Sequence, residues 1–313
     1  MKSNAKIFVA GSTGLVGSAL VRCLIKTGHT NICGPSRAEL DLMESMAVSD
    51  YFKKEKPDYV FLAAAKVGGI LANDSFPADF IRSNLMIQNN VIHESHAHGA
   101  KRLLFLGSSC IYPKFCPQPM KEEYFMTGPL EATNSAYATA KIAGVEMCRA
   151  YNRQYGSAFV PVMPTNLYGP NDNFDLETSH VLPAMIKRFH DAKQASADSV
   201  TIWGTGKPRR EFLHVDDLAR ACVCMMTIPV EKLSLKNSPL FNIGVGKDIS
   251  IKELAELVSR ITGFRGDIAY DASKPDGTPQ KLLDVSKMND LGWRPEINLT
   301  DGIRNLYDWY KRR

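Results

Sequence analysis

The sequence predicts an α/β fold, in which a parallel sheet flanked by helices is followed by a smaller C-terminal α/β lobe. Three observations lead to this prediction. A short apolar run is followed by a glycine-rich turn, Gly11 to Gly17, and then by a helical pattern. Apolar runs and helical patterns then alternate as far as about Pro170, where the alternation stops. Such runs are typical of strands buried in a parallel sheet, and the alternation predicts repeated strand–helix units.

Composition excludes several classes of protein. Of 313 residues, 44% are hydrophobic and 23% are charged, which argues against a disordered or fibrous chain. A net charge of +5 without a Lys/Arg stripe gives no reason to expect nucleic acid. No apolar run approaches about 20 residues and no leader pattern precedes the first strand, so we expect a cytoplasmic protein without a membrane partner. Seven scattered cysteines without a C-x-x-C pair indicate reduced thiols.

The first predicted unit is a dinucleotide-binding turn. The strand Lys6–Ala10 leads through Gly11, Gly14 and Gly17 into a helix that reaches about Lys26. Glycines at this spacing allow a tight turn and a close backbone approach to a pyrophosphate, which faces the helix N-terminus. A plain turn is the alternative, but the strand before it and the helix after it favour a Rossmann-type site. We expect residues 1–169, with returns from about 209–246, to bind the dinucleotide, and residues 170–313 to form mainly a substrate-binding lobe.

The second strand, around Asn31–Gly34, predicts the choice of cofactor. Ser36 and Arg37 follow it at the distance where an NAD-selective site carries a carboxylate. A hydroxyl and a guanidinium suit a 2′-phosphate instead, so NADP is expected rather than NAD. The alternative for Arg37 is a solvated loop charge. Asp41 and Leu42 are expected near the adenine.

A third strand, Tyr59–Ala64, and a long helix, Pro77–Ser95, come next. Three histidines close that helix (His93, His96 and His98), but no cysteine or carboxylate completes a tetrahedral set, so no metal is expected. The fourth strand, Leu103–Gly107, places Ser108, Ser109 and Cys110 at its carboxyl end. Ligands bind at this end of the strands in open parallel sheets.

Tyr137 and Lys141 are the candidate catalytic residues of the next predicted helix. This helix is expected to run to about Tyr155. Residues four apart lie on one helical face, so the ammonium is expected to lower the pKa of the phenol from about 10. The phenol could then exchange a proton with a sugar or alcohol oxygen, which the Ser108 hydroxyl would also hold. By itself the Tyr-x-x-x-Lys pattern is weak, since an exposed amphipathic helix shows it equally well.

The second half of the chain is predicted in less detail. The expected strands and helices are a strand Phe159–Met163, a helix from Val181 to about Ala192, a segment Thr201–Gly204, a segment Arg209–Asp217 that leads into a helix to about Thr227, a strand Leu240–Gly244 and a helix that Ser250 caps.

Five ordered motifs give the chain a family resemblance. They are Gly11-x-x-Gly14-x-x-Gly17, the Ser108 loop, Tyr137-x-x-x-Lys141, Arg210-x-Phe-x-His214-Val-Asp-Asp and Asn242-Ile-Gly. Together they resemble the extended short-chain dehydrogenase/reductases, which act mostly on nucleotide sugars. Further stretches resemble those members that epimerise GDP-4-keto-6-deoxymannose at two carbons and then reduce its ketone with NADPH. These stretches are Leu62–Ile70, Gly107–Pro113, Met163–Gly169, Trp203–Gly206 and Lys274–Pro279.

The resemblance implies roles for named residues. Ser108, Tyr137 and Lys141 would form the reductase triad, and Cys110 and His180 would be the base and the acid of the epimerisation. The GDP-sugar would contact Arg188, Trp203, Arg210 and Asp276. The cofactor would contact Gly11, Ser12, Thr13, Gly14, Leu15, Val16, Gly17, Arg37, Asp41, Leu42, Leu106, Gly107, Ser108, Ser109, Lys141, Pro164, Thr165, Asn166, Leu167 and His180. A homodimer through the helices Pro77–Ser95 and Tyr137–Tyr155 is implied by family analogy alone.

Some of these residues have ordinary alternatives. Cys110 has a rival in Cys116, and His180 would be equally ordinary as a capping or solvent-facing side chain. The alternative for Arg188 is an ordinary surface charge, and the alternative for Trp203 is a packed aromatic side chain. One departure matters: many members carry His-Arg where this chain has Ser12-Thr13, so the NADP preference depends more on Arg37.

Three other functions are alternatives to the epimerase/reductase. A nucleotide-sugar dehydratase typically follows its catalytic hydroxyl residue with an Asp-Glu pair, where this chain has Ser109-Cys110, and a 4-epimerase should carry a carboxylate near residue 37. A non-catalytic NADP-binding module commonly loses the tyrosine or the lysine, and both are kept here. The sequence therefore favours an enzyme over a non-catalytic module.

Overall fold

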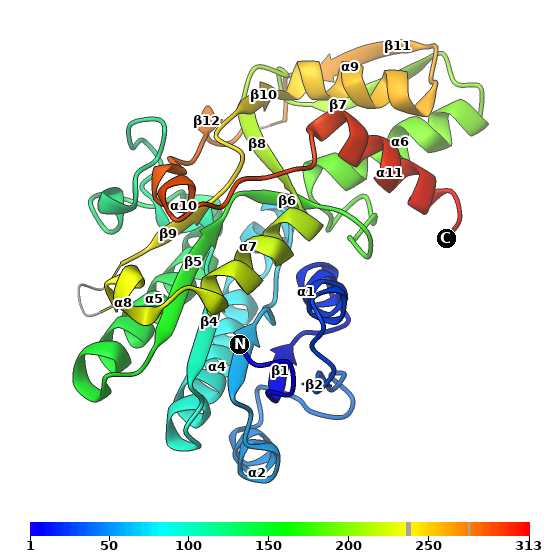
Figure 1. The fold of residues 1–313 in the computed structure, drawn as a ribbon. Helices are drawn as coiled ribbons and strands as arrows, with labels where there is room; N and C mark the ends of the chain where they lie inside the picture. The colour runs from blue at the N-terminus through cyan, green and yellow to red at the C-terminus, as the bar shows by residue number, and fades with distance from the viewer. Residues whose placement is uncertain (236–238, 275) are drawn as a thin grey trace.

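A six-stranded parallel sheet forms the centre of the protein in the computed structural model, which describes residues 1–235, 239–274 and 276–313 (Figure 1). Pro275 of the predicted Lys274–Pro279 motif lies outside these ranges. The strand order is β2-β1-β3-β4-β5-β9. The strands are β1 (Ile7–Ala10), β2 (Ile32–Cys33), β3 (Tyr59–Leu62), β4 (Arg102–Leu106), β5 (Phe159–Pro164) and β9 (Phe241–Ile243). The predicted fold class is confirmed.

Alternate side chains of each central strand are buried on opposite faces of this sheet. In β1, Ile7 and Val9 pack under α1 and α7, whereas Phe8 and Ala10 pack under α2, α4 and α5. Both faces are therefore covered, which is why the strands read as continuous apolar runs. The helices are α1 (Leu15–Lys26), α2 (Ser45–Glu55), α4 (Pro77–Ala97), α5 (Ser135–Tyr155) and α7 (Val215–Thr227).

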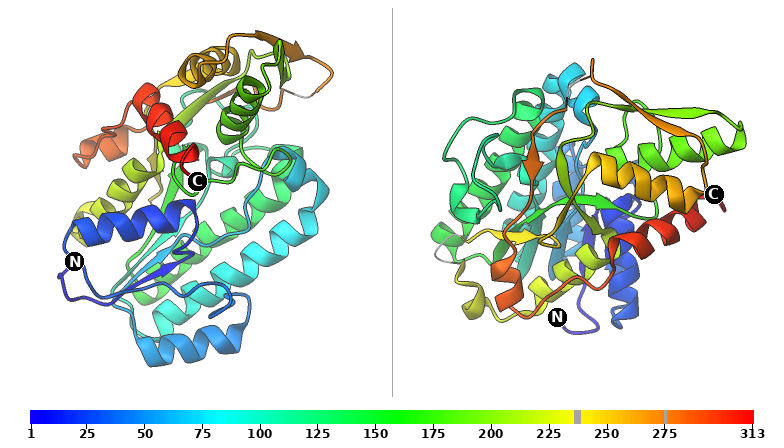
Figure 2. Two further views of the ribbon diagram at one scale, coloured as in Figure 1. Left: turned by 90° about the vertical axis from the view of Figure 1, so that its right-hand side faces the viewer. Right: turned by 90° about the horizontal axis from the view of Figure 1, so that it is seen from above.

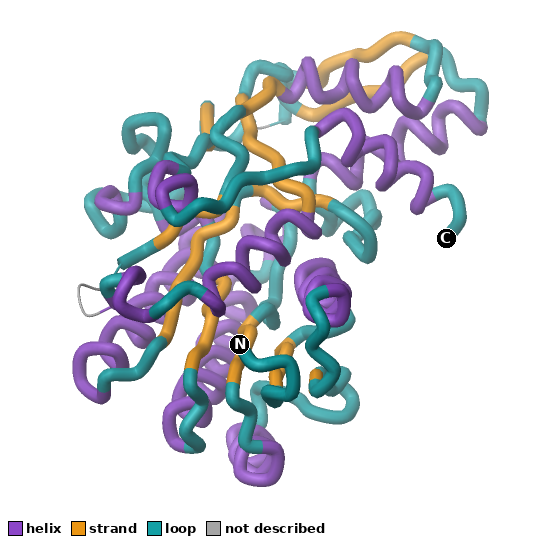
Figure 3. The backbone as a smooth tube through the Cα atoms, in the orientation of Figure 1, coloured by secondary structure: helices purple, strands orange, loops and turns teal. Residues whose placement is uncertain are grey.

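A second group of elements packs around a separate hydrophobic core above the carboxyl ends of the sheet (Figure 3). Two strands, β7 and β11, pair in parallel, while β8 lies between β10 and β12 and also pairs with β6. These elements are β6 (Asn166–Tyr168), β7 (Ser199–Trp203), β8 (Arg209–His214), β10 (Asp248–Ser250), β11 (Asp267–Asp271), β12 (Gln280–Lys281), α6 (Val181–Gln194), α9 (Ile251–Thr262) and α11 (Leu299–Tyr310). Ser250 caps α9 through a reciprocal pair of hydrogen bonds with Glu253, as predicted.

Several elements were not predicted. The remaining short helices are α3 (Ile70–Ser75), α8 (Val230–Leu233), α10 (Ser286–Asp290) and the 3₁₀ turns Ser109–Ile111, Glu122–Tyr124 and Ala132–Asn134. Sequence analysis also missed α2, α11 and the strands β6, β10, β11 and β12. The short strands form by pairing with distant segments, which local patterns do not reveal; β6, for example, pairs with β8 more than 40 residues later.

Helices α4 and α5 are the longest and lie side by side on one face of the sheet (Figure 2). The histidines at the end of α4 have ordinary partners: His93 bonds the Tyr151 hydroxyl at 2.8 Å, and His96 stacks on Tyr155. Within the described ranges, no helix is both long enough and apolar enough to cross a membrane.

Candidate active site

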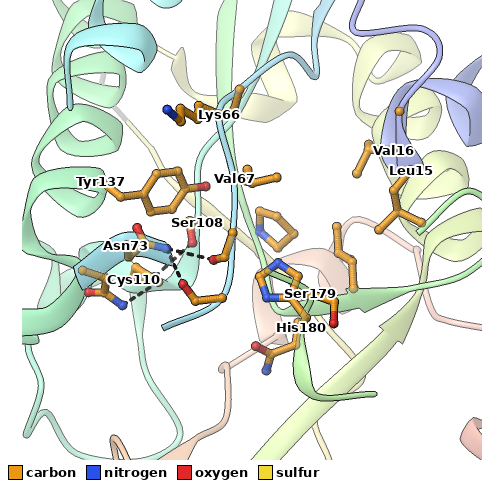
Figure 4. Close-up of a pocket in the computed structure, with 18 of the residues that line it drawn as sticks. Leu15, Val16, Lys66, Val67, Asn73, Ser108, Cys110, Tyr137, Ser179 and His180 are labelled. Carbon is orange, nitrogen blue, oxygen red and sulfur yellow. Dashed lines mark hydrogen bonds between the residues drawn. The ribbon is translucent and has the colours of Figure 1, made fainter. Parts of the chain in front are cut away.

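A cavity of about 860 Å³ opens at the carboxyl ends of the central strands and extends under the C-terminal elements. Both parts of the chain line it: the glycine-rich turn and the ends of β4 and β5 on one side, and α6, β7 and β8 on the other. Figure 4 shows Ser108, Cys110, Tyr137 and His180 arranged around this space. Its size lies in the upper range for small-molecule sites. Of the residues predicted for cofactor or substrate, all except Ser12 line it.

Gly11 and Gly17 form the glycine-rich turn that is predicted to bind the pyrophosphate of the cofactor. Gly11 has a φ of +80°, and a Cβ there would lie 3.0 Å from the Ala64 Cα. A Cβ on Gly17 would overlap the Gly11 carbonyl oxygen, so α1 packs directly on the turn. Gly14 is the N-cap of α1 and has no side chain to cap the first N–H groups of the helix, so these donors are available to bind an anion. Ser12 faces away, donating its hydroxyl to the Gly34 carbonyl at 2.6 Å.

Replacing Gly17 by alanine is expected to lower the free energy of unfolding by roughly 2 to 3 kcal/mol, because the backbone of the turn must move to admit the methyl group. Gly14→Ala is the matched control. The nearest atom to its added Cβ is the Gly11 carbonyl oxygen at 3.5 Å, an ordinary contact. The control should cost less than about 1 kcal/mol, the usual loss at a helix N-cap. Urea unfolding followed by circular dichroism measures both, and equal losses would contradict this account.

Arg37 is an exposed cation that lines the cavity near the glycine-rich turn. Its side chain is 81% exposed, and its Nη2 lies 3.6 Å from the Asp41 carboxylate, an exposed ion pair that holds it only weakly. Ser36 was predicted to offer a donor here, but its N–H and its hydroxyl both donate to the Glu39 carboxylate, at 2.7 and 2.8 Å. That part of the prediction is wrong, because a nearby side chain already takes both Ser36 donors. Arg37 keeps its guanidinium exposed at the cavity, where the sequence predicts the 2′-phosphate.

Tyr137 and Lys141 lie one turn apart on α5, as the spacing predicts. Lys141 is buried; its Nζ donates to the Leu106 carbonyl oxygen at 2.8 Å and lies 5.8 Å from the centre of the Tyr137 ring. The Tyr137 ring packs edge-on against Phe80. Helix α5 therefore anchors the ammonium to the end of β4, directly before Ser108.

Burial controls the acidity of this pair. Desolvation raises the pKa of Tyr137 above its ordinary value, and the nearby Cys110 thiol adds to the effect, while a hydrogen bond from Ser108 acts in the opposite direction. Burial lowers the pKa of Lys141 to about 7. The sequence-based expectation that Lys141 lowers the pKa of the phenol is not met, because desolvation is the main cause of the shift at both groups and Lys141 is not among the causes at Tyr137. The phenol is therefore protonated near neutral pH and carries the proton that reduction of a ketone requires.

Cys110 and His180 line the same cavity from different elements, the turn after β4 and the start of α6. Cys110 sits in the 3₁₀ turn after β4, and its Sγ is the acceptor for the Asn134 side-chain amide at 3.4 Å. His180 is the N-cap residue of α6, but its side chain does not cap that helix. Desolvation lowers the pKa of His180, and the positive charge of Lys281 lowers it further. The rival thiol, Cys116, does not line the cavity, and burial raises its pKa.

The four predicted substrate residues gather at the far end of the cavity. Arg188 donates to the Thr201 carbonyl oxygen at 3.0 Å, and its guanidinium lies 5.2 Å from the centre of the Trp203 ring. Trp203 is 48% exposed, so its indole is available as a flat apolar surface. Burial lowers the pKa of the Arg210 guanidinium. Both carboxylate oxygens of Asp276 accept hydrogen bonds from Thr205, each at 2.7 Å.

Sequence reasoning missed Asn134 and Lys281, which both contact the Cys110 sulfur. Each had a signal. Asn134 comes three residues before Tyr137, at the position where a helix cap is expected, and Lys281 comes two residues after the Lys274–Pro279 motif. Neither signal specifies a contact with a thiol, which depends on how β12 and α5 pack against the loop after β4.

A Rossmann-type sheet, a glycine-rich turn and a Ser-Tyr-Lys set around one cavity define an enzyme of the dinucleotide-dependent epimerase and reductase class. The model of the NAD dependent epimerase/dehydratase family matches residues 7–244, and the chain belongs to that family.

Similar proteins lie within this family. The chain is 56% identical over 310 residues to "Putative GDP-L-fucose synthase 2" of Arabidopsis thaliana, covering 99% of this chain and 93% of that one. It is 50% identical over 311 residues to "GDP-L-fucose synthase" of Escherichia coli, covering 98% and 97%. Among solved structures, MlghC, a GDP-mannoheptose C4 reductase from Campylobacter jejuni with NADP bound, superposes with a TM-score of 0.91 at 44% identity, covering 99% of each chain.

Proposed function

We propose that this protein converts GDP-4-keto-6-deoxy-D-mannose to GDP-L-fucose, by 3,5-epimerisation followed by NADPH-dependent reduction of the 4-keto group. The observation that carries the proposal is the shared cavity. A thiol and an imidazole, Cys110 and His180, face the same space as Ser108, Tyr137 and Lys141. A reductase alone needs the last three groups only. The relatives named as GDP-L-fucose synthases at 50–56% identity support the choice of substrate.

The epimerisation uses the acidity of hydrogens beside a ketone. Cys110 takes a proton from carbon 3 or carbon 5, and His180 returns one to the opposite face. Negative charge develops on the 4-keto oxygen, where the hydroxyls of Ser108 and Tyr137 are the donors already in place. Burial and the charge of Lys281 lower the pKa of His180, so a proton bound to this imidazole is released more readily than from a free histidine.

The residues present fit a dinucleotide cofactor. A side chain at Gly11 or Gly17 would fill the turn, and α1 begins there without a capping side chain, so the turn leaves room and donors for a pyrophosphate. The cofactor supplies a hydride to carbon 4 when bound. Tyr137 gives its proton to the carbonyl oxygen, Ser108 holds that oxygen, and Lys141, with a pKa near 7, is able to replace the proton on the phenol.

NADP selectivity is proposed to depend on Arg37. Replacing it by alanine should weaken NADP binding about tenfold, the loss expected when a charge-assisted hydrogen bond to a phosphate is removed. NAD lacks the 2′-phosphate and should bind the variant as it binds the wild type, so NAD serves as the internal control. Fluorescence titration with both reduced cofactors measures the two affinities. Equal weakening of NADP and NAD would assign Arg37 a structural role instead.

The test of the whole proposal is a single incubation of the protein with GDP-4-keto-6-deoxy-D-mannose and NADPH. GDP-L-fucose is the expected product, identified by NMR of the isolated sugar nucleotide. Formation of the 4-reduced sugar without inversion at carbons 3 and 5 would identify a simple C4 reductase. No consumption of NADPH would contradict the proposal.

The division of labour along the chain follows from the same proposal. Residues 1–169, with the returns at 209–246, hold the cofactor, and residues 170–313 provide most contacts to the GDP-sugar. The cytoplasmic location and a homodimer through α4 and α5 stay predictions. The homodimer is proposed on family analogy alone.

A further inference from the structure

The Cys110 thiol has two donors that the roles described so far do not use. Its sulfur lies 3.4 Å from the Asn134 amide nitrogen and 3.8 Å from the Lys281 ammonium. The three residues come from separate elements: the turn after β4, the start of α5, and β12. Nothing in local sequence brings them together, so the contact is made by the tertiary fold.

Asn134 is placed unusually for its residue type. It is the N-cap residue of α5, where an asparagine side-chain oxygen normally accepts from an N–H of the first turn. Here the side chain makes no capping hydrogen bond and directs its amide at the sulfur instead. Its Oδ1 is buried and has no hydrogen-bond partner within the part of the chain that the structure describes. The side chain thus serves the cavity and not the helix.

Lys281 is held at the sulfur by its own backbone. In β12 it pairs with Arg210 of β8. The N–H of Leu282 donates to the Gln118 side-chain oxygen at 2.9 Å, and the N–H of Leu283 donates to the Glu211 carboxylate at 3.0 Å. Glu211 is fully buried. Ordering a lysine contact normally costs both backbone and side-chain conformational entropy. At Lys281 the strand pairing already fixes the backbone, so only the side chain has to be ordered.

Cations are the majority of the titratable side chains that face the Cys110 sulfur. Tyr137 of α5, Arg210 of β8 and Lys281 of β12 face Cys110. Lys281 also faces His180, Cys116 and Glu131, whose carboxylate pairs with Lys114 at 2.9 Å. Two of the three groups that face the sulfur are cations, and the carboxylate of the cluster already has a lysine of its own.

We propose that the Lys281 ammonium and the Asn134 amide position the Cys110 sulfur and stabilise the sulfur anion that takes the proton from the sugar. The inference rests on the epimerisation assigned above. The thiolate lone pair forms the S–H bond, the C–H bond breaks, and its electron pair moves to the 4-keto oxygen as the enolate. Lys281 transfers no proton in this step. Its positive charge stabilises the sulfur before the transfer and is left beside a neutral thiol after it.

The test is the pH dependence of Cys110 alkylation by iodoacetamide, which reacts with the thiolate. Trypsin places Cys110 and Cys116 in different peptides, Leu103–Lys114 and Phe115–Lys121, so mass spectrometry reads each thiol separately. Lys281→Met should slow alkylation of Cys110 at pH 7 about tenfold, because a neighbouring cation favours the charged form of an acid by at least this factor. Lys281→Arg should restore most of the rate, and Asn134→Ala should reduce it about threefold.

The matched control is Lys247→Met, which removes an exposed lysine outside the cavity and should change nothing. The proposal predicts that Lys281→Met moves the midpoint of the pH profile upward while the rate at high pH stays the same. An unchanged midpoint, or a lower rate at every pH, would overturn it. The measurement needs no substrate, so it stands even if the protein fails to make GDP-L-fucose. With the substrate, the same variant should lose hydrogen exchange but keep NADPH binding.

Discussion

Replacing Tyr137 by phenylalanine is expected to lower the rate of ketone reduction by about a thousandfold, while exchange of the sugar hydrogens with solvent continues in part. Phenylalanine keeps the packing against Phe80 and the contact with the Lys141 ammonium, and removes only the hydroxyl. A positioned acid is typically worth between a hundred- and ten-thousandfold. Ser108 still holds the carbonyl oxygen, so the enolate can form without the phenol.

Two signals separate the steps in that variant. Consumption of NADPH reports reduction, and deuterium entering the sugar from heavy water reports epimerisation. Serine at position 108 is kept, so a loss of both signals to the same extent would show that Tyr137 holds the substrate and does not donate the proton.

Replacing Cys110 by serine is expected to slow the exchange of sugar hydrogens with solvent deuterium at least a hundredfold, with NADPH affinity unchanged. Serine fits the space, but its hydroxyl is far too weak an acid to form the anion that removes a proton near neutral pH. Cys116→Ser is the control, since that thiol lies outside the cavity lining. Exchange at the wild-type rate in Cys110→Ser would place the base elsewhere, and a loss in the control as well would indicate general damage to the loop.

The central fold was predictable because its signals are local. Buried parallel strands are continuous apolar runs, and the glycines of the first turn follow directly from β1, so both appear in any short window of sequence. The missed strands are different. Only two residues of β12 pair with β8, and they do so across more than 70 positions of chain. The helix α11 did carry a signal, an Asn298 cap followed by Ile303, Leu306 and Tyr307 at helical spacing.

The candidate site was predictable where one segment supplies the chemistry. Tyr137 and Lys141 are four residues apart, so helical geometry alone places them together. The acidity of the pair was not predictable, because desolvation depends on how deeply α5 packs against β4. Sequence analysis expected the Ser36 donors to be available to a phosphate. In the structure, both of them donate to the Glu39 carboxylate, a contact that the sequence pattern did not indicate.

Glu211 connects the two halves of the cavity and limits how they can change. Its carboxylate receives N–H groups from Val245, Gly246 and Leu283, and its carbonyl oxygen accepts the Thr165 hydroxyl. The wall that would hold the nicotinamide and the segment bearing Lys281 therefore share one anchor. A new sugar preference is consequently easier to reach by exchanging side chains than by transplanting the C-terminal lobe from a relative. A chimera that shortens residues 276–283 by one position is expected to displace both Lys281 and the Leu283 N–H that Glu211 binds.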